Sequence, residues 1–367
     1  MTTAPGPTVL DAASLLCEVA DELVVRTVRD THTAWVDRIY GVGRLATRAQ
    51  SPSFGERAHR GIASAVYAGV GGGLRLASTG LDLVAATGRG PHLESTPEGR
   101  FVSSAVNGLI GDRLLRERPQ MAIPMAVRHA GADVDPTPAG LGAAFPEASG
   151  RLVVFLHGLC ENESYWQRHR DRTGTTYAEE LAARGWTPLM LRANTGLRLR
   201  ENGAALTGLM QQVVEAWPVP VERIALVGHS MGGLVIRAAG AVTADVEEPW
   251  SSKVSDVVTL GTPHLGAPIA WGIGHGSRGL GVLPETAAFG LPHARYRLVA
   301  ATLTESQRHP VGHLVGDLLV RPGSAYGRDR RGRSLFPDAD VLHVGRTDHF
   351  GLLNHPQVHT ALLEWLA

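Results

Sequence analysis

The stretch "IALVGHSMGG", Ile224 to Gly233, sets a short apolar run directly against glycines, a histidine and one serine. The run from Arg223 to Val227 predicts a buried β-strand, and "LVIRAAGAV" after the glycines predicts a helix. A turn this sharp strains the backbone of its central residue, and small neighbours at Gly228 and Gly232 let the flanking chain approach closely. The hydroxyl of Ser230 is therefore expected to point outward from the turn.

The pattern G-x-S-x-G between a strand and a helix is typical of a nucleophile elbow, in which the serine attacks an acyl group. The helix that begins behind Ser230 would present backbone N–H groups, Met231 first, to a developing oxyanion. The alternative is a tight turn in which Ser230 only caps the helix. The strand before the motif and the helix after it favour the catalytic interpretation.

The composition limits the classes of function. With 367 residues, the chain can form one large α/β domain with an appendage, or two domains. Its 35 basic and 35 acidic residues balance, so no nucleic-acid partner is expected. Ser252, not glycine, precedes Lys253, which excludes a phosphate-binding loop of the G-x-x-x-x-G-K type.

Cysteine usage and the N-terminus suggest a cytoplasmic protein. Cys17 and Cys160 are too few for a disulfide framework or a cysteine-based zinc site. The first 25 residues lack a basic region followed by an unbroken apolar core, so they predict no secretory signal. No stretch reaches the roughly 18 apolar residues of a membrane span.

Residues 1–118 predict a helical N-terminal extension. Apolar residues recur at helical spacing between 10 and 42, and a small-residue-rich, helix-prone segment follows from 51 to 88. Ser95, Thr96 and Pro97 predict the start of another helix. These apolar stripes would pack on the neighbouring domain, or serve a homodimer or membrane-surface contact.

Residues 119–367 predict an α/β domain. "MAIPMAVRHAG" and "GLGAAFP" suggest an early antiparallel pair of strands. Six further apolar runs, separated mostly by helix-compatible sequence, start at residues 151, 186, 223, 254, 296 and 339. Strands alternating with helices predict a mostly parallel central sheet covered on both faces, with ligands bound at the carboxyl ends of its strands.

Two loops at these strand ends predict further parts of a site. In "FLHGLCENESYW" the Leu159 N–H could join that of Met231 in an oxyanion hole, although a tight turn explains the glycine equally well. Cys160 beside it lacks an elbow and is expected to fill space. The Gly-rich segment 269–295 could be a lid, with Trp271, Ile273, Leu280 and Leu283 facing an acyl chain, or a plain surface excursion.

A serine nucleophile needs a histidine base, and in this architecture the base follows the acid in the chain. His349 follows the last predicted strand, in the loop before a terminal helix. His343 lies within that strand and is expected to be structural. His355 and His359 have the spacing of zinc ligands on a helix, but no H-E-x-x-H motif accompanies them, so neither a metal nor a cofactor is expected.

Three aspartates compete for the role of the acid. Asp317 follows the penultimate predicted strand, where this chain order places it. Asp340 would begin the final strand, and Asp348 adjoins His349 too closely to reach its ring from behind. Topology favours Asp317, whose alternative role is that of a turn cap.

Five blocks of the sequence carry a family resemblance: "VVFLHGL", "LVGHSMGGLVIR", "TLGTPHLGAP", "VGDLLV" and "TDHFGLLNHPQV". In this order they resemble bacterial lipases and esterases of the α/β-hydrolase fold, similar to triacylglycerol lipases and inositol-deacylase-like hydrolases. The resemblance implies a triad of Ser230, Asp317 and His349, with the backbone N–H groups of Leu159 and Met231 as the oxyanion hole.

The resemblance covers about residues 121–367, and residues 1–118 have no recognised counterpart. It implies hydrolysis of a small-molecule ester or lipid, with a hydrophobic acyl group, through an acyl-enzyme on Ser230. An acyltransferase would use the same triad. A catalytically silent scaffold would be expected to have lost one of its three members, and all three are present.

Overall fold

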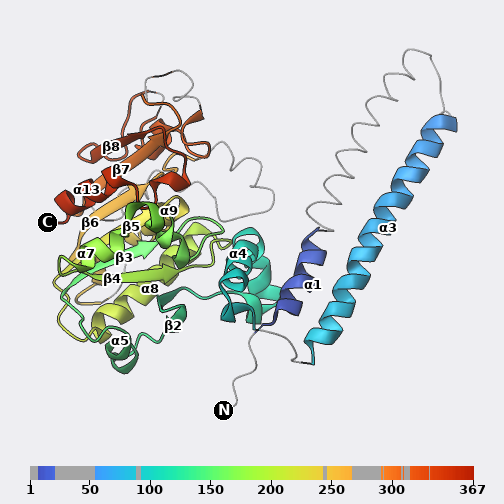
Figure 1. Ribbon diagram of the computed structural model, residues 1–367, viewed down its shortest axis with the longest axis horizontal. Helices are drawn as coiled ribbons and strands as arrows, with labels where there is room; N and C mark the ends of the chain where they lie inside the picture. Colours follow the sequence, from blue (N-terminus) through green and yellow to red (C-terminus); the bar gives the residue numbers. More distant parts are fainter. Residues whose placement is uncertain are drawn as a thin grey trace. The chain divides into compact units, whose positions relative to one another are not determined.

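The computed structural model describes residues 7–20, 54–87, 92–242, 246–266, 291, 293–306, 309, 315–329 and 331–367 (Figure 1). The chain divides into two compact units, residues 1–103 and residues 104–367. The predicted lid 269–295 therefore lies almost entirely outside the described residues, as do its four candidate apolar residues.

The described part of the first unit is mostly helical, with an isolated antiparallel bridge between Thr8 and His92. Helix α1 (Val9–Val19) begins with a capping box in which Thr8 and Asp11 satisfy each other's backbone N–H groups. It packs on α3 (Phe54–Ala85), a single helix of 32 residues, through a hydrogen bond between the buried hydroxyls of Ser14 and Ser78. The helix-prone character of 54–85 is thus confirmed, whereas residues 21–53 lie outside the description.

Helix α4 (Pro97–Glu117) begins where the sequence predicted, with Thr96 accepting a hydrogen bond from the Gly99 N–H and Pro97 in the first turn. It runs from the first unit into the second and is kinked at Ile110. The Asn107 amide ties it to the chain that enters the sheet, because it donates to the Met121 carbonyl and accepts from the Ile123 N–H.

The second unit is built on one sheet of eight strands in the order β2-β1-β4-β3-β5-β6-β7-β8. Strand β1 pairs antiparallel with β2 and with β4, and every later pair is parallel. The eight strands are β1 (Ala126–His129), β2 (Ala132–Val134), β3 (Arg151–Leu156), β4 (Thr187–Arg192), β5 (Arg223–His229), β6 (Val254–Leu260), β7 (Arg295–Thr302) and β8 (Asp340–Gly345). The six predicted parallel strands and the mostly parallel sheet are confirmed.

The early antiparallel pair was placed wrongly in part. The partner of β1 is β2, reached through Ala130 and Gly131, which both have positive φ and form a two-residue hairpin turn. The segment "GLGAAFP" instead belongs to helix α5 (Pro138–Ala144). Thr137 caps this helix and Pro138 occupies its first turn, so the local start signals outweigh the apolar run.

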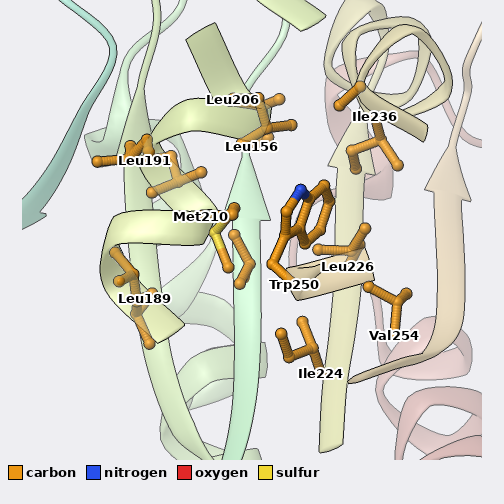
Figure 2. Close-up of a cluster of buried hydrophobic side chains, with 14 of the residues drawn as sticks. Leu156, Leu189, Leu191, Leu206, Met210, Ile224, Leu226, Ile236, Trp250 and Val254 are labelled. Atoms are coloured by element: carbon orange, nitrogen blue, oxygen red, sulfur yellow. The ribbon is translucent and has the colours of Figure 1, made fainter. Parts of the chain in front are cut away.

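Helices cover both faces of the sheet. On one face, α8 (Leu199–Ala216) and α9 (Met231–Gly240) bury their apolar sides against alternate residues of the strands. Figure 2 shows these side chains, with Trp250 among residues of β3 and β5. On the other face, α7 (Tyr177–Ala182) and α13 (Pro356–Trp365) pack on the remaining strand residues. The described residues of this unit also form the short helices α6 (Arg170–Thr173) and α12 (Pro322–Ala325).

Candidate active site

Ser230 lies at the turn between β5 and α9, with φ 51° and ψ −121°. This conformation is rare for any residue with a side chain and costs on the order of 1–3 kcal/mol, so the surrounding structure must hold it. The Ser230 N–H donates to the Leu260 carbonyl of the neighbouring strand at 2.8 Å. The strained serine that the sequence predicted at this turn is therefore present.

Two glycines allow the turn to close against the end of β3. A Cβ atom on Gly232 would lie 2.3 Å from the Leu156 carbonyl oxygen, and one on Gly158 would lie 2.9 Å from the Ser230 Cβ. Neither contact is sterically allowed. The loop after β3 therefore runs directly beside the serine.

His349 and Asp317 come together from two different loops. His349 follows β8 and Asp317 follows β7, and the two side chains are only 2% and 1% exposed. His349 Nδ1 lies 2.7 Å from Asp317 Oδ2, and the backbones are also joined, since the His349 N–H donates to the Asp317 carbonyl at 3.0 Å. A carboxylate in this position fixes the imidazole ring and its tautomer.

The aspartate is itself held by its own loop. Asp317 Oδ1 accepts the N–H groups of Leu319 at 3.0 Å and Val320 at 2.7 Å, which leaves Oδ2 for the histidine. The two rival aspartates have other contacts. Asp340 lies 3.6 Å from the Arg297 guanidinium, and the exposed Asp348 accepts the Gly351 N–H at 2.7 Å.

The other ring nitrogen of His349 is the atom that a serine hydroxyl would approach. Nε2 is buried and, within the part of the chain that the structure describes, has no hydrogen-bond partner. Ser230 Oγ thus makes no hydrogen bond to it in this conformation. Such catalytic bonds are often long without substrate. The His349 ring lies against Gly261, where a Cβ atom would be 3.1 Å from its Cε1, directly after the carbonyl that holds Ser230.

The loop after β3 leaves one backbone donor unused. The Gly158 N–H donates to Glu161, the Cys160 N–H to Thr195 Oγ1, and the Glu161 N–H to the Gly158 carbonyl. Among the described residues, the N–H of Leu159 finds no acceptor. The same holds for Met231 in the first turn of α9. Both predicted oxyanion donors are thus available.

Cys160 lacks the environment of a nucleophile. Burial first, and the Glu161 carboxylate second, raise the pKa of its thiol to about 11. The remaining histidines have structural contacts: His343 lies in β8 beside Thr302 Oγ1 at 2.8 Å, His355 caps α13, and the His359 ring packs on Tyr177. No group of three metal-binding side chains occurs within the described ranges.

Sequence reasoning missed a buried pair beneath the serine, His229 and Glu161. His229 Nδ1 lies 3.0 Å from both carboxylate oxygens of Glu161, and Nε2 lies 3.2 Å from the His349 carbonyl. Both residues stand inside motifs that the sequence singled out, next to Ser230 and to Leu159–Cys160. Their pairing spans 68 positions, and no local pattern encodes it.

Residues 146–271 match a protein family described as "Putative serine esterase (DUF676)". The match covers about a third of the chain and includes the loop after β3, Ser230 and α9, but not Asp317 or His349. The chain has an α/β-hydrolase fold. A comparison of the sequence with curated proteins finds no match.

Solved α/β-hydrolase structures are similar to this chain at low identity. Mature lipase BlEst2 of Bacillus licheniformis is 18% identical, with a TM-score of 0.43 over 59% of this chain and 92% of its own. Esterase Pf2001 of Pyrococcus furiosus is 15% identical, with a TM-score of 0.38 over 59% and 82%. Naproxen esterase of Bacillus subtilis is 11% identical, with a TM-score of 0.36 over 60% and 84%.

The described helices fall short of the combined length and hydropathy of a membrane span. None combines enough residues with enough apolar character to cross a bilayer.

Proposed function

We propose that the protein is a serine hydrolase that cleaves carboxylic esters through an acyl-enzyme on Ser230. The observation that carries the proposal is the buried hydrogen bond between His349 Nδ1 and Asp317 Oδ2, with Nε2 left without a partner among the described residues and the ring against Gly261, which directly follows the carbonyl that holds Ser230. A histidine held in this way can accept a proton only through Nε2. The match of residues 146–271 to serine esterases supports the same class of enzyme.

The contacts support a mechanism of acyl transfer to water. His349 Nε2 takes the proton of the Ser230 hydroxyl as Oγ attacks the ester carbonyl, and Asp317 stabilises the imidazolium. The oxygen of the tetrahedral intermediate accepts hydrogen bonds from the N–H groups of Leu159 and Met231, which have no other acceptor among the described residues. The imidazolium then protonates the leaving alcohol, and water releases the acid by the same steps.

A fluorophosphonate probe tests this assignment because it reacts only with an activated serine. The wild-type protein is expected to be labelled and the Ser230→Ala variant is not. Ser324, whose hydroxyl donates to the Gly266 carbonyl, provides a control, because Ser324→Ala should keep full labelling. A folded wild-type protein that stays unlabelled, with and without detergent, would contradict the proposal.

Substrate preference is the finer part of the proposal. The apolar residues of segment 269–295 favour esters with a hydrophobic acyl group. Hydrolysis of p-nitrophenyl esters of increasing chain length measures this preference, and activity should rise beyond the acetate. Products formed in the presence of alcohol acceptors distinguish a hydrolase from an acyltransferase, since only a transferase would form the new ester in preference to the acid.

A further inference from the structure

His229 and Glu161 form a fully enclosed pair directly beneath the nucleophile turn. His229 precedes Ser230 and is 0% exposed, while Glu161 ends the loop that holds Leu159 and is 3% exposed. A buried charged pair contributes little net stability compared with apolar residues of the same size. A contribution to the stability of the fold therefore does not explain why this pair is present at the site.

The pair joins two loops that lie far apart in the sequence. On one side, Glu161 Oε2 accepts the Gly158 N–H at 2.7 Å. On the other side, His229 Nε2 lies 3.2 Å from the backbone oxygen of His349. One chain of hydrogen bonds thus runs from the predicted oxyanion loop, through Glu161 and His229, to the backbone of the predicted catalytic base.

This chain requires a specific protonation state. Nε2 of His229 faces a backbone oxygen, which only accepts, so Nε2 carries a proton and donates; Nδ1 faces Glu161, which accepts a second donated bond when its carboxyl is ionised. Burial disfavours the imidazolium, but the Glu161 carboxylate outweighs burial and the pKa of His229 is raised. For Glu161, burial is likewise outweighed by His229, so its pKa is lowered. Both directions favour an imidazolium paired with a carboxylate.

We infer that His229 and Glu161 are positioning residues, which fix the loop of Leu159 relative to the loop of His349 so that the oxyanion donor and the base address the same acyl group. The inference rests on the proposed function. Glu161 acts by holding the Gly158 N–H, which leaves the next amide, that of Leu159, as the free donor. His229 acts by holding the backbone of His349. Neither residue touches the substrate.

Four variants test the inference in the full chain. Glu161→Gln keeps the shape but removes the charge. His229→Asn keeps a donor near the Nδ1 position, toward Glu161, and His229→Gln keeps one near Nε2, toward the His349 carbonyl. The double variant Glu161→Gln/His229→Gln removes both charges and the donor at the Nδ1 position, so the bond between the two side chains is altered from both sides. His343→Gln, which alters a histidine with a side-chain contact in β8, is the matched control.

The expected result is a loss in kcat of about 10- to 100-fold for each single variant, with KM changed less than about threefold. The second-order rate of fluorophosphonate labelling should fall in parallel. Because the two residues act as one unit, the double variant should be no slower than the slower single variant. A residue that only fills space would not give this separation of kcat from KM. Folded variants with the wild-type kcat would overturn the inference.

A measurement on the wild-type protein keeps the inference testable if the variants do not fold. Nitrogen chemical shifts of His229 at pH 7 should be those of a doubly protonated ring. A neutral ring would contradict the two donated bonds. The two proposals fail separately: without Ser230 labelling the proposed function falls whatever the shifts are, whereas labelled protein with a neutral His229 or unaffected variants rejects only the positioning role.

Discussion

The turn that carries Ser230 and the loops that carry Asp317 and His349 hold their side chains by different means. The turn is shaped by its backbone. The position of Ser230 is fixed by its positive φ and by the close approach of neighbouring chain segments at Gly158 and Gly232. The two loops are held by hydrogen bonds between residues 32 positions apart. Substitutions that add atoms should therefore disrupt the Ser230 turn. Substitutions that remove a hydrogen bond but keep the shape of the side chain should disrupt the two loops.

The largest effect is expected where a bond is removed at constant shape. Asp317→Asn keeps the size of the side chain but puts an amide where His349 Nδ1–H donates, which selects the wrong tautomer or orientation. We expect kcat to fall by about 10⁴-fold. Asp348→Asn, an exposed neighbour of His349, should retain activity within about twofold. Steady-state kinetics of ester hydrolysis measures both, and equal losses would contradict the proposed role of Asp317.

Adding a single methyl group next to His349 should give the next largest effect. Gly261 has φ +60°, and a Cβ there would lie 3.1 Å from the ring of His349. Gly266 has φ +89°, and within the described residues nothing lies within 4 Å of its Cβ position. Both alanine variants acquire backbone strain of about 1–2 kcal/mol, but only Gly261→Ala displaces the ring.

The comparison of the two glycine variants isolates the position of the base. We expect kcat to fall about 100-fold in Gly261→Ala, since a misplacement near 1 Å has this effect, and to change little in Gly266→Ala. Thermal unfolding should show a loss of stability in both variants, larger in Gly261→Ala, where the added Cβ also lies 3.1 Å from Leu352 Cδ1. If both kept the wild-type kcat, His349 would not need the position that Gly261 gives it.

The difference between the backbone-shaped turn and the bond-held loops explains which features could be predicted from the sequence. Backbone-shaped features have local signatures, so the six parallel strands, the Ser230 turn and the start of α4 at Pro97 were predicted from a few residues each. Bonds between distant segments have none. Asp317 was favoured only through chain order, and the pairing of His229 with Glu161 was invisible.

The misplaced second strand of the early pair has a related cause. An apolar, small-residue run such as "GLGAAFP" fits a strand or a helix, and the deciding signals, Thr137 and Pro138, stand just before it. The prediction of a homodimer or membrane-surface contact for residues 1–118 stays a prediction. Exposed Val66, Val70 and Leu76 on α3 do not identify what would cover them.

Asn354 should matter for stability more than for chemistry. Its side chain accepts the Tyr177 N–H and donates to the carbonyls of Trp166 and Arg168, which anchors the His349 loop to the start of α7. Asn354→Ala leaves these buried groups unpaired, so the free energy of unfolding should fall by about 2 kcal/mol. Gln357→Ala, an exposed position on α13, should change it by less than about 0.5 kcal/mol. Denaturant unfolding measures both variants, and equal stabilities would show that the hydrogen bonds of Asn354 do not stabilise the fold.

The smallest effect is expected in the pH dependence that the His229 pair gives to folding. The groups facing His229 are Glu161, His349, Asp317 and, beyond Glu161, His157. Because the pKa of His229 is raised from 6.5 in the folded state, its stabilisation is complete below pH 6.5 and is lost as the pH rises through the folded value. The lowered pKa of Glu161 acts oppositely: its share is present above pH 4.5 and is lost as the pH falls through the folded value.

The stability of the wild-type protein relative to His229→Gln should therefore be greatest between about pH 4.5 and 6.5 and decline on the alkaline side. Urea unfolding of both proteins from pH 5 to pH 9 measures the difference directly, and the other titrating groups, present in both, largely cancel. A difference that stays constant across this range would mean that His229 does not change its proton affinity on folding. In that case the link between the two loops would be an ordinary neutral hydrogen bond. The loop of Leu159 and the loop of His349 would then not be joined through a charged pair.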